Sequence, residues 1–138
     1  MKWVTFFTVL LYSQVSNSQD ISGEAVKSQL VKEWEMAKTM TNEYLESMPA
    51  DKYSFKPQDS IRSFAQQMLH MAQVTNAMIS HGTGASRIFS RTRNLERSTG
   101  AQVKDSVMYY VNTSYKFAIS AIKNMDASKL GDRKSAIF

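Results

Sequence analysis

The sequence predicts an all-α fold in a single domain, and three observations support this. The chain has 138 residues, which is room for one domain. It contains two prolines and five glycines, too few for the many turns of an all-β fold. Apolar residues recur at steps of three or four along three long stretches, which is the spacing of amphipathic helices. The apolar fraction of 43% and the charged fraction of 21% are those of a globular chain.

The first 18 residues have the layout of a secretory signal peptide. Lys2 precedes an apolar run of ten residues, and small residues follow at Ser16 and Ser18. That run is too short to span a bilayer, which needs about 20 residues. We expect a signal peptide over 1–18, a helical domain over 19–138, and export to the periplasm or cell envelope without a stable membrane span. A buried N-terminal strand is the alternative.

The first predicted helix runs from about Gly23 to Ser47. Pro49 ends it, because proline disfavours helix at the residue before it. The link "PADKYSFKPQD" is then a loop, and we expect its aromatic side chains, Tyr53 and Phe55, to close one end of a bundle. The apolar stripe of this helix consists of Val26, Leu30, Trp34, Ala37, Thr41, Tyr44 and Met48.

The second predicted helix begins after Asp59 or Ser60, either of which can serve as its N-cap. Gly82 is a suitable residue just beyond its C-terminus. Its main apolar face is formed by Ile61, Ala65, Met68, Ala72 and Ile79.

The third predicted helix runs from about Ala101 to Met125, with Thr99 and Gln102 spaced as a capping box. A polar and basic segment precedes it. Because each helix has one wide apolar face, we expect an antiparallel bundle. The stripe of the third helix is Val103, Val107, Tyr110, Val111, Ser114, Phe117, Ala118, Ala121, Ile122 and Met125.

His70 lies in the middle of the second helix and raises the main chemical question of the chain. It lies away from the main apolar face, on the side of Val74, Ala77 and His81, and so faces a different neighbour. The residues alone leave two interpretations open, a structural or surface histidine and a metal ligand. His81 cannot share an ion with it, because eleven residues of helix span roughly 16 Å. A role in capping the helix C-terminus fits His81 better.

Other features favour simpler interpretations. The arginines of the segment between the second and third helices could hold an oxyanion, but a solvated linker is the favoured interpretation. Asn112 begins a glycosylation pattern inside a predicted helix, so we treat the pattern as chance. The net charge of +5 is spread along the helices, which argues against nucleic-acid binding. The chain has no cysteine, so stability must come from packing, which suits a bacterial periplasm. The arginines concerned are Arg87, Arg91, Arg93 and Arg97.

One part of the chain resembles a known family. Residues 44–80 carry features similar to the end of the first helix and the second helix of DinB-like (YfiT-like) domains, and the resemblance extends over roughly 24–125. The matching positions are Leu45, Met48, Pro49, Tyr53, Phe55, Lys56, Pro57, Arg62, Ser63, Phe64 and His70.

The resemblance implies an up-and-down four-helix bundle with a divalent metal, nickel or zinc, held by three histidines. His70 matches the ligand on the second helix, so we expect it to be a metal ligand. The two others would form a His-x-x-x-His pair on a fourth helix, but no histidine follows His81 here and the chain shows three long helices. The implied activity is that of a metal-dependent hydrolase or thiol transferase acting on a small molecule. Neither the substrate nor the catalytic residues can be assigned.

Two other classes of function remain open at this point. One is a metal-free bundle that binds a small molecule in a pocket between its helices. The other is an assembly protein, such as a homodimer, whose apolar groove accepts a helix from a partner.

Overall fold

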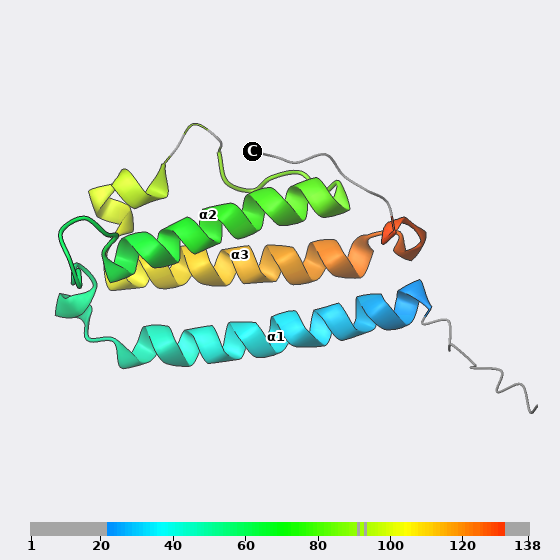
Figure 1. The fold of residues 1–138 in the computed structure, drawn as a ribbon, viewed down its shortest axis with the longest axis horizontal. Helices are drawn as coiled ribbons and strands as arrows, with labels where there is room; N and C mark the ends of the chain where they lie inside the picture. The colour runs from blue at the N-terminus through cyan, green and yellow to red at the C-terminus, as the bar shows by residue number, and fades with distance from the viewer. Residues whose placement is uncertain (1–21, 91, 93, 132–138) are drawn as a thin grey trace, which may run out of the picture.

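The structure, a computed structural model, describes residues 22–90, 92 and 94–131, and the regular secondary structure in these ranges consists of helices alone (Figure 1). This confirms the predicted all-α class. The predicted signal peptide lies outside the described residues. Within the described ranges, none of the helices has the length and apolarity of a membrane span. The elements are α1 (Gly23–Ser47), η1 (Ala50–Lys52), α2 (Phe64–Thr83), η2 (Leu95–Arg97), η3 (Thr99–Ala101), α3 (Lys104–Asn124) and η4 (Ala127–Lys129).

The helix α3 lies between α1 and α2 and packs against both (Figure 1). α1 runs antiparallel to α2, as expected, and it also runs antiparallel to α3. α2 and α3 run in the same direction, because the segment 84–103 returns along the bundle before α3 begins. We call this segment the crossover. The expected antiparallel order therefore holds for α1 and α2 and fails from α3 onward, and the crossover lies against α2.

α1 has the predicted bounds. Ser22 caps its N-terminus, and the backbone leaves the helical region at Met48, where ψ is 121°. The following residue, Pro49, accounts for this extended conformation. The Lys104 side chain of α3 donates hydrogen bonds to the carbonyl oxygens of Glu46 and Met48, both at 2.9 Å. It thereby pairs carbonyl groups that a helix end leaves without partners.

The start of α2 differs from the prediction. Ser63, not Asp59 or Ser60, is the N-cap, and it forms a reciprocal capping box with Gln66. The Ser63 hydroxyl accepts from the Gln66 N–H at 3.2 Å, and the Gln66 side chain accepts from the Ser63 N–H at 2.9 Å. Two N–H groups of the first turn are paired in this way. A cap at Asp59 or Ser60 lacks this reciprocal pair.

Two further helix ends also differ from the prediction. α2 ends at Gly84, whose φ of 79° lies in the left-handed region, rather than at Gly82. α3 begins after Val103, which has no side-chain cap, so the predicted capping box of Thr99 and Gln102 is wrong. The reason is that the Gln102 side chain donates to the carbonyl oxygen of Glu96 in the crossover.

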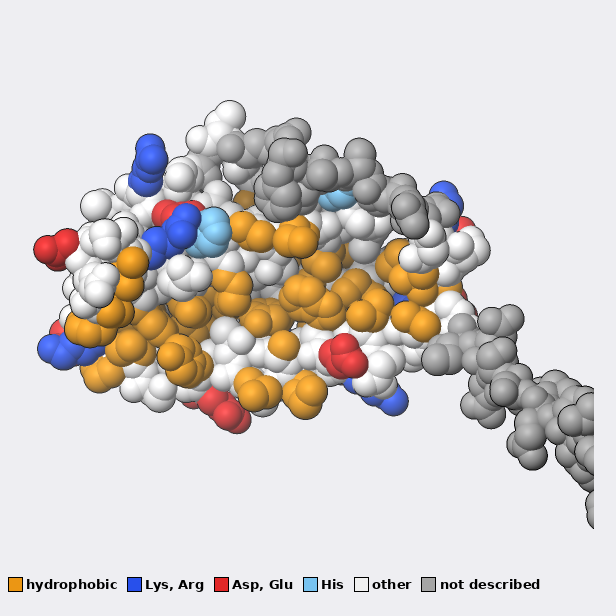
Figure 2. Space-filling view, in the orientation of Figure 1, with side chains coloured by type: hydrophobic (Ala, Val, Ile, Leu, Met, Phe, Trp, Pro, Cys, Tyr) orange, Lys and Arg blue, Asp and Glu red, His pale blue; other side chains and the backbone are white. Residues whose placement is uncertain are grey.

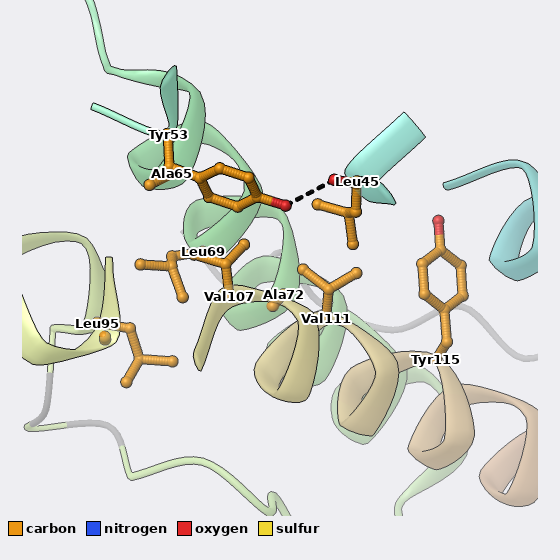
Figure 3. Close-up of a cluster of buried hydrophobic side chains, with 10 residues drawn as sticks. Leu45, Tyr53, Ala65, Leu69, Ala72, Leu95, Val107, Val111 and Tyr115 are labelled. Atoms are coloured by element: carbon orange, nitrogen blue, oxygen red, sulfur yellow. Dashed lines mark hydrogen bonds between the residues drawn. The ribbon is translucent and has the colours of Figure 1, made fainter. Parts of the chain in front are cut away.

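The hydrophobic core is densest where the end of α1 meets the starts of α2 and α3 (Figure 3). Leu45, Leu69 and Val111 are fully buried there. Tyr53 is also buried, and its hydroxyl donates to the Leu45 carbonyl oxygen at 2.7 Å. Tyr53 therefore closes this end of the bundle as predicted, whereas Phe55 is 55% exposed and does not.

α1 is much less buried than its predicted stripe suggests. Leu45 is its one buried residue, while Tyr44 is 61% exposed. Met36 and Met40, beside the stripe, are 60% and 63% exposed. The physical reason is that α1 packs mainly against α3, so the rest of its apolar surface stays open. Figure 2 shows hydrophobic side chains spread over the face of the molecule between α1 and α2.

Candidate functional site

His70 lies on the side of α2 that faces the crossover. The ring is partly exposed, at 36%. Its neighbour is Glu96 in η2, which is 18% exposed. The prediction that His70 faces a different neighbour from the main apolar stripe is thus confirmed, and that neighbour is the crossover.

Glu96 joins His70 of α2 to Arg62, which lies just before the N-cap of that helix. One carboxylate oxygen, Oε1, accepts a hydrogen bond from His70 Nδ1 at 2.5 Å. The other, Oε2, accepts from Arg62 Nε at 2.6 Å. These distances are short, as expected for charge-assisted hydrogen bonds. We refer to Arg62, His70 and Glu96 as the carboxylate cluster.

The protonation of the carboxylate cluster follows from its surroundings. Burial raises the pKa of Glu96, but hydrogen bonds from Arg62 and His70, with the charges of both, outweigh it and hold this pKa below its usual value. Glu96 is therefore ionised at neutral pH and can only accept hydrogen bonds. His70 must then carry a proton on Nδ1, so in the neutral ring Nε2 keeps a free lone pair.

The crossover backbone is also fixed to its neighbours at this point. The Glu96 carbonyl oxygen accepts from the side chains of Gln66 at 3.4 Å and Gln102 at 2.6 Å. The Leu95 N–H donates to the Gln73 side chain at 2.9 Å, and the Leu95 side chain is buried. A solvated linker, the favoured interpretation of the sequence, is therefore wrong for this part of the crossover.

Sequence reasoning missed Glu96, although a signal was present. It is the one acidic residue between Gly84 and Val103, among four arginines. A single carboxylate in so basic a segment is a candidate partner for cationic side chains on a neighbouring element. Its partner on α2 could not be read from the sequence, because residues 70 and 96 are far apart along the chain.

The other candidate residues lie away from the carboxylate cluster or outside the described ranges. His81 lies in the last turn of α2, as predicted, and does not join His70. Arg97 is exposed, and Arg91 and Arg93 are outside the described residues. The Asn112 side chain is paired with Asn42 of α1 at 2.7 and 2.9 Å, so it is engaged in packing α1 on α3.

A complete metal site is not assembled by the residues that the structure describes. They contain no group of three His, Cys, Asp or Glu side chains that could hold a metal ion. His70 with Glu96 supplies one ligand and a carboxylate to orient it, whereas a zinc site needs at least three protein ligands. The residues present therefore fit part of a metal site and not the whole of one.

The described part of the chain forms a helical bundle, and the DinB family is one of helical bundles. The model of the DinB family matches residues 16–126, more than half of the chain, and the chain belongs to this family. No curated protein and no solved structure matches it.

Proposed function

We propose that this DinB-family protein is a divalent-metal-dependent enzyme of the hydrolase or thiol-transferase type, and that His70 is one of its metal ligands. The observation that supports this most is the hydrogen bond from His70 Nδ1 to Glu96. A histidine that binds a metal through one ring nitrogen usually donates the other N–H to a carboxylate or carbonyl. The pair thus has the arrangement of a ligand with its orienting carboxylate.

The other side chains of the carboxylate cluster would act on the ligand and not on the substrate. Arg62 holds the second oxygen of Glu96 and so fixes the carboxylate plane. Glu96 in turn fixes the orientation and the tautomer of the His70 ring. Nickel or zinc would suit such an imidazole ligand. The sequence holds no third histidine, so water or groups of another molecule would complete the coordination.

Calorimetric titration of the purified chain with zinc and with nickel tests this proposal. We expect saturable binding that His70→Ala weakens at least tenfold, because an imidazole ligand would be lost. His81→Ala is the matched control, since it removes the other histidine of the chain, and it should bind as the parent does. Absence of binding in the millimolar range, or equal binding by the His70→Ala variant, would contradict the proposal.

We further propose that the protein is exported, on the basis of the charged start, apolar run and small residues of its first 18 positions. The destination would be the periplasm or cell envelope. Mass measurement of the exported product should then give a chain that begins at Gln19.

A second candidate function is assembly with a partner helix or a second copy. The observation that favours it is the open apolar surface of α1, where Met36, Met40 and Tyr44 are each about 60% exposed. Exposed apolar patches of this kind often mark interaction surfaces. A soluble monomer in sedimentation, without binding of an apolar dye, would count against this role.

A further inference from the structure

A cavity lies between α2 and the crossover, next to the carboxylate cluster. Its volume is about 310 Å³. That is close to the lower end of the range for pockets that hold small molecules. Its walls are Gln73, Val74, Asn76, Ala77, Arg87, Phe89, Ser90, Asn94 and Glu96. We call it the crossover pocket.

Two hydrogen-bond donors of the crossover pocket lack acceptors among the described residues. Asn76 is 1% exposed, and its Oδ1 accepts from the Phe89 N–H at 3.1 Å, but its Nδ2 has no partner there. Arg87 is partly buried, and none of the described residues forms a hydrogen bond or ion pair with its guanidinium group. A buried donor without an acceptor is costly, so an acceptor at this place would be stabilising.

The charge balance of the crossover pocket also favours an anion. Glu96 brings a negative charge to its wall, but both oxygens of that carboxylate are already bonded, to His70 and Arg62. The positive charge of Arg87 has no such partner in the part of the chain that is described. Guanidinium groups bind carboxylates and phosphates with paired, charge-assisted hydrogen bonds.

Part of the wall of the crossover pocket is apolar. Val74 and Ala77 from α2 face it, and Phe89 contributes from the crossover. The Phe89 ring is held in place by an edge contact with Tyr110 of α3, with ring centroids 5.7 Å apart. The pocket therefore offers an apolar surface beside its donors.

We propose that the crossover pocket binds a small organic oxyanion, a carboxylate or phosphate attached to a compact apolar body. Arg87 would hold the oxyanion, and Val74, Ala77 and Phe89 would pack against the body. This goes beyond the proposed function, because binding here requires no metal at His70.

Nuclear magnetic resonance titration tests the proposal with three probes: phenyl phosphate, benzoate and inorganic phosphate. A chelator is present throughout, so a metal at His70 cannot contribute. We expect phenyl phosphate or benzoate, or both, to shift the amide signals of residues 73–77 and 87–90 with saturation. Whichever of the two binds more tightly identifies the oxyanion as phosphate or carboxylate.

Two variants on the crossover locate the binding. Arg87→Gln should weaken binding at least tenfold, because one charged hydrogen-bonding group is lost. Arg97→Gln removes the same charge from an exposed position outside the pocket and should bind as the parent does. Equal weakening by both variants would overturn the proposal, as would failure of both organic probes to bind. Equal affinity for inorganic phosphate and phenyl phosphate would also overturn it, because the apolar wall would then contribute nothing.

Discussion

The residue-scale result is the pairing of His70 with Glu96. Helical periodicity and the family resemblance together predicted the place and the ligand role of His70. Periodicity could not supply Glu96, because the crossover has no regular pattern and its contact with α2 depends on the whole bundle. The ligand role itself stays a prediction, while the hydrogen bond from His70 Nδ1 to the Glu96 carboxylate is observed at 2.5 Å.

Replacing Glu96 by glutamine should destabilise the protein in a pH-dependent way. The pKa of Glu96 lies below its usual value of 4.5 in the folded state. Its carboxylate therefore stabilises the fold above that pH, and the contribution is lost as the pH falls through the lowered folded pKa. We expect Glu96→Gln to cost on the order of 1–3 kcal/mol at pH 7, from the loss of charged hydrogen bonds.

Urea unfolding of both proteins from pH 7 down to pH 3 measures this difference. The gap in unfolding free energy should shrink as the medium becomes more acidic. Glu43→Gln, on the exposed surface of α1, is the control and should show little change at any pH. A gap for Glu96→Gln that stays constant with pH would mean that its carboxylate charge does not contribute.

At the scale of the element, sequence signals located α1 and missed the starts of α2 and α3. Pro49 marks the end of α1 through a local steric effect, which the sequence alone reveals. The start of α2 is also marked locally, by Ser63 and Gln66 at capping-box spacing, and the prediction overlooked this signal. α3 begins later than predicted, because the Gln102 side chain donates to the Glu96 carbonyl oxygen and does not cap the helix. Helix ends set by distant partners cannot be read from local sequence.

The two glycines at the end of α2 should respond to alanine with opposite signs. Gly82 lies within the helix, and an added Cβ there would meet nothing within 4 Å. Gly82→Ala should therefore stabilise the protein, by up to about 1 kcal/mol. Gly84 has a φ of 79°, so Gly84→Ala should destabilise it by about 1–2 kcal/mol.

Thermal unfolding of both variants beside the parent gives this comparison directly. Each variant adds one methyl group to the parent, so the Gly82→Ala and Gly84→Ala variants control for size in one another. A helix that ended at Gly82, as the sequence predicts, would reverse the two signs.

At the scale of the whole molecule, the class of fold was predictable and the path of the chain was not. Three amphipathic stretches and few turn residues predict a bundle whatever the order of its helices. The direction of α3 relative to α2 depends on the crossover, whose length permits either direction. The open surface of α1 follows from the packing of α1 on α3, and a stripe of apolar residues does not say how much of it is covered.

The central claim is that His70 is a metal ligand oriented by Glu96. The protonation of the two ring nitrogens of His70 tests this claim most directly. Long-range proton–nitrogen correlation spectra distinguish the two neutral tautomers of a histidine, and His81→Asn assigns the signals of His70. In the neutral ring, we predict a proton on Nδ1, a free Nε2, and a shift of the Nε2 signal on addition of zinc. A proton on Nε2, or nitrogen signals that zinc leaves unchanged, would contradict the account.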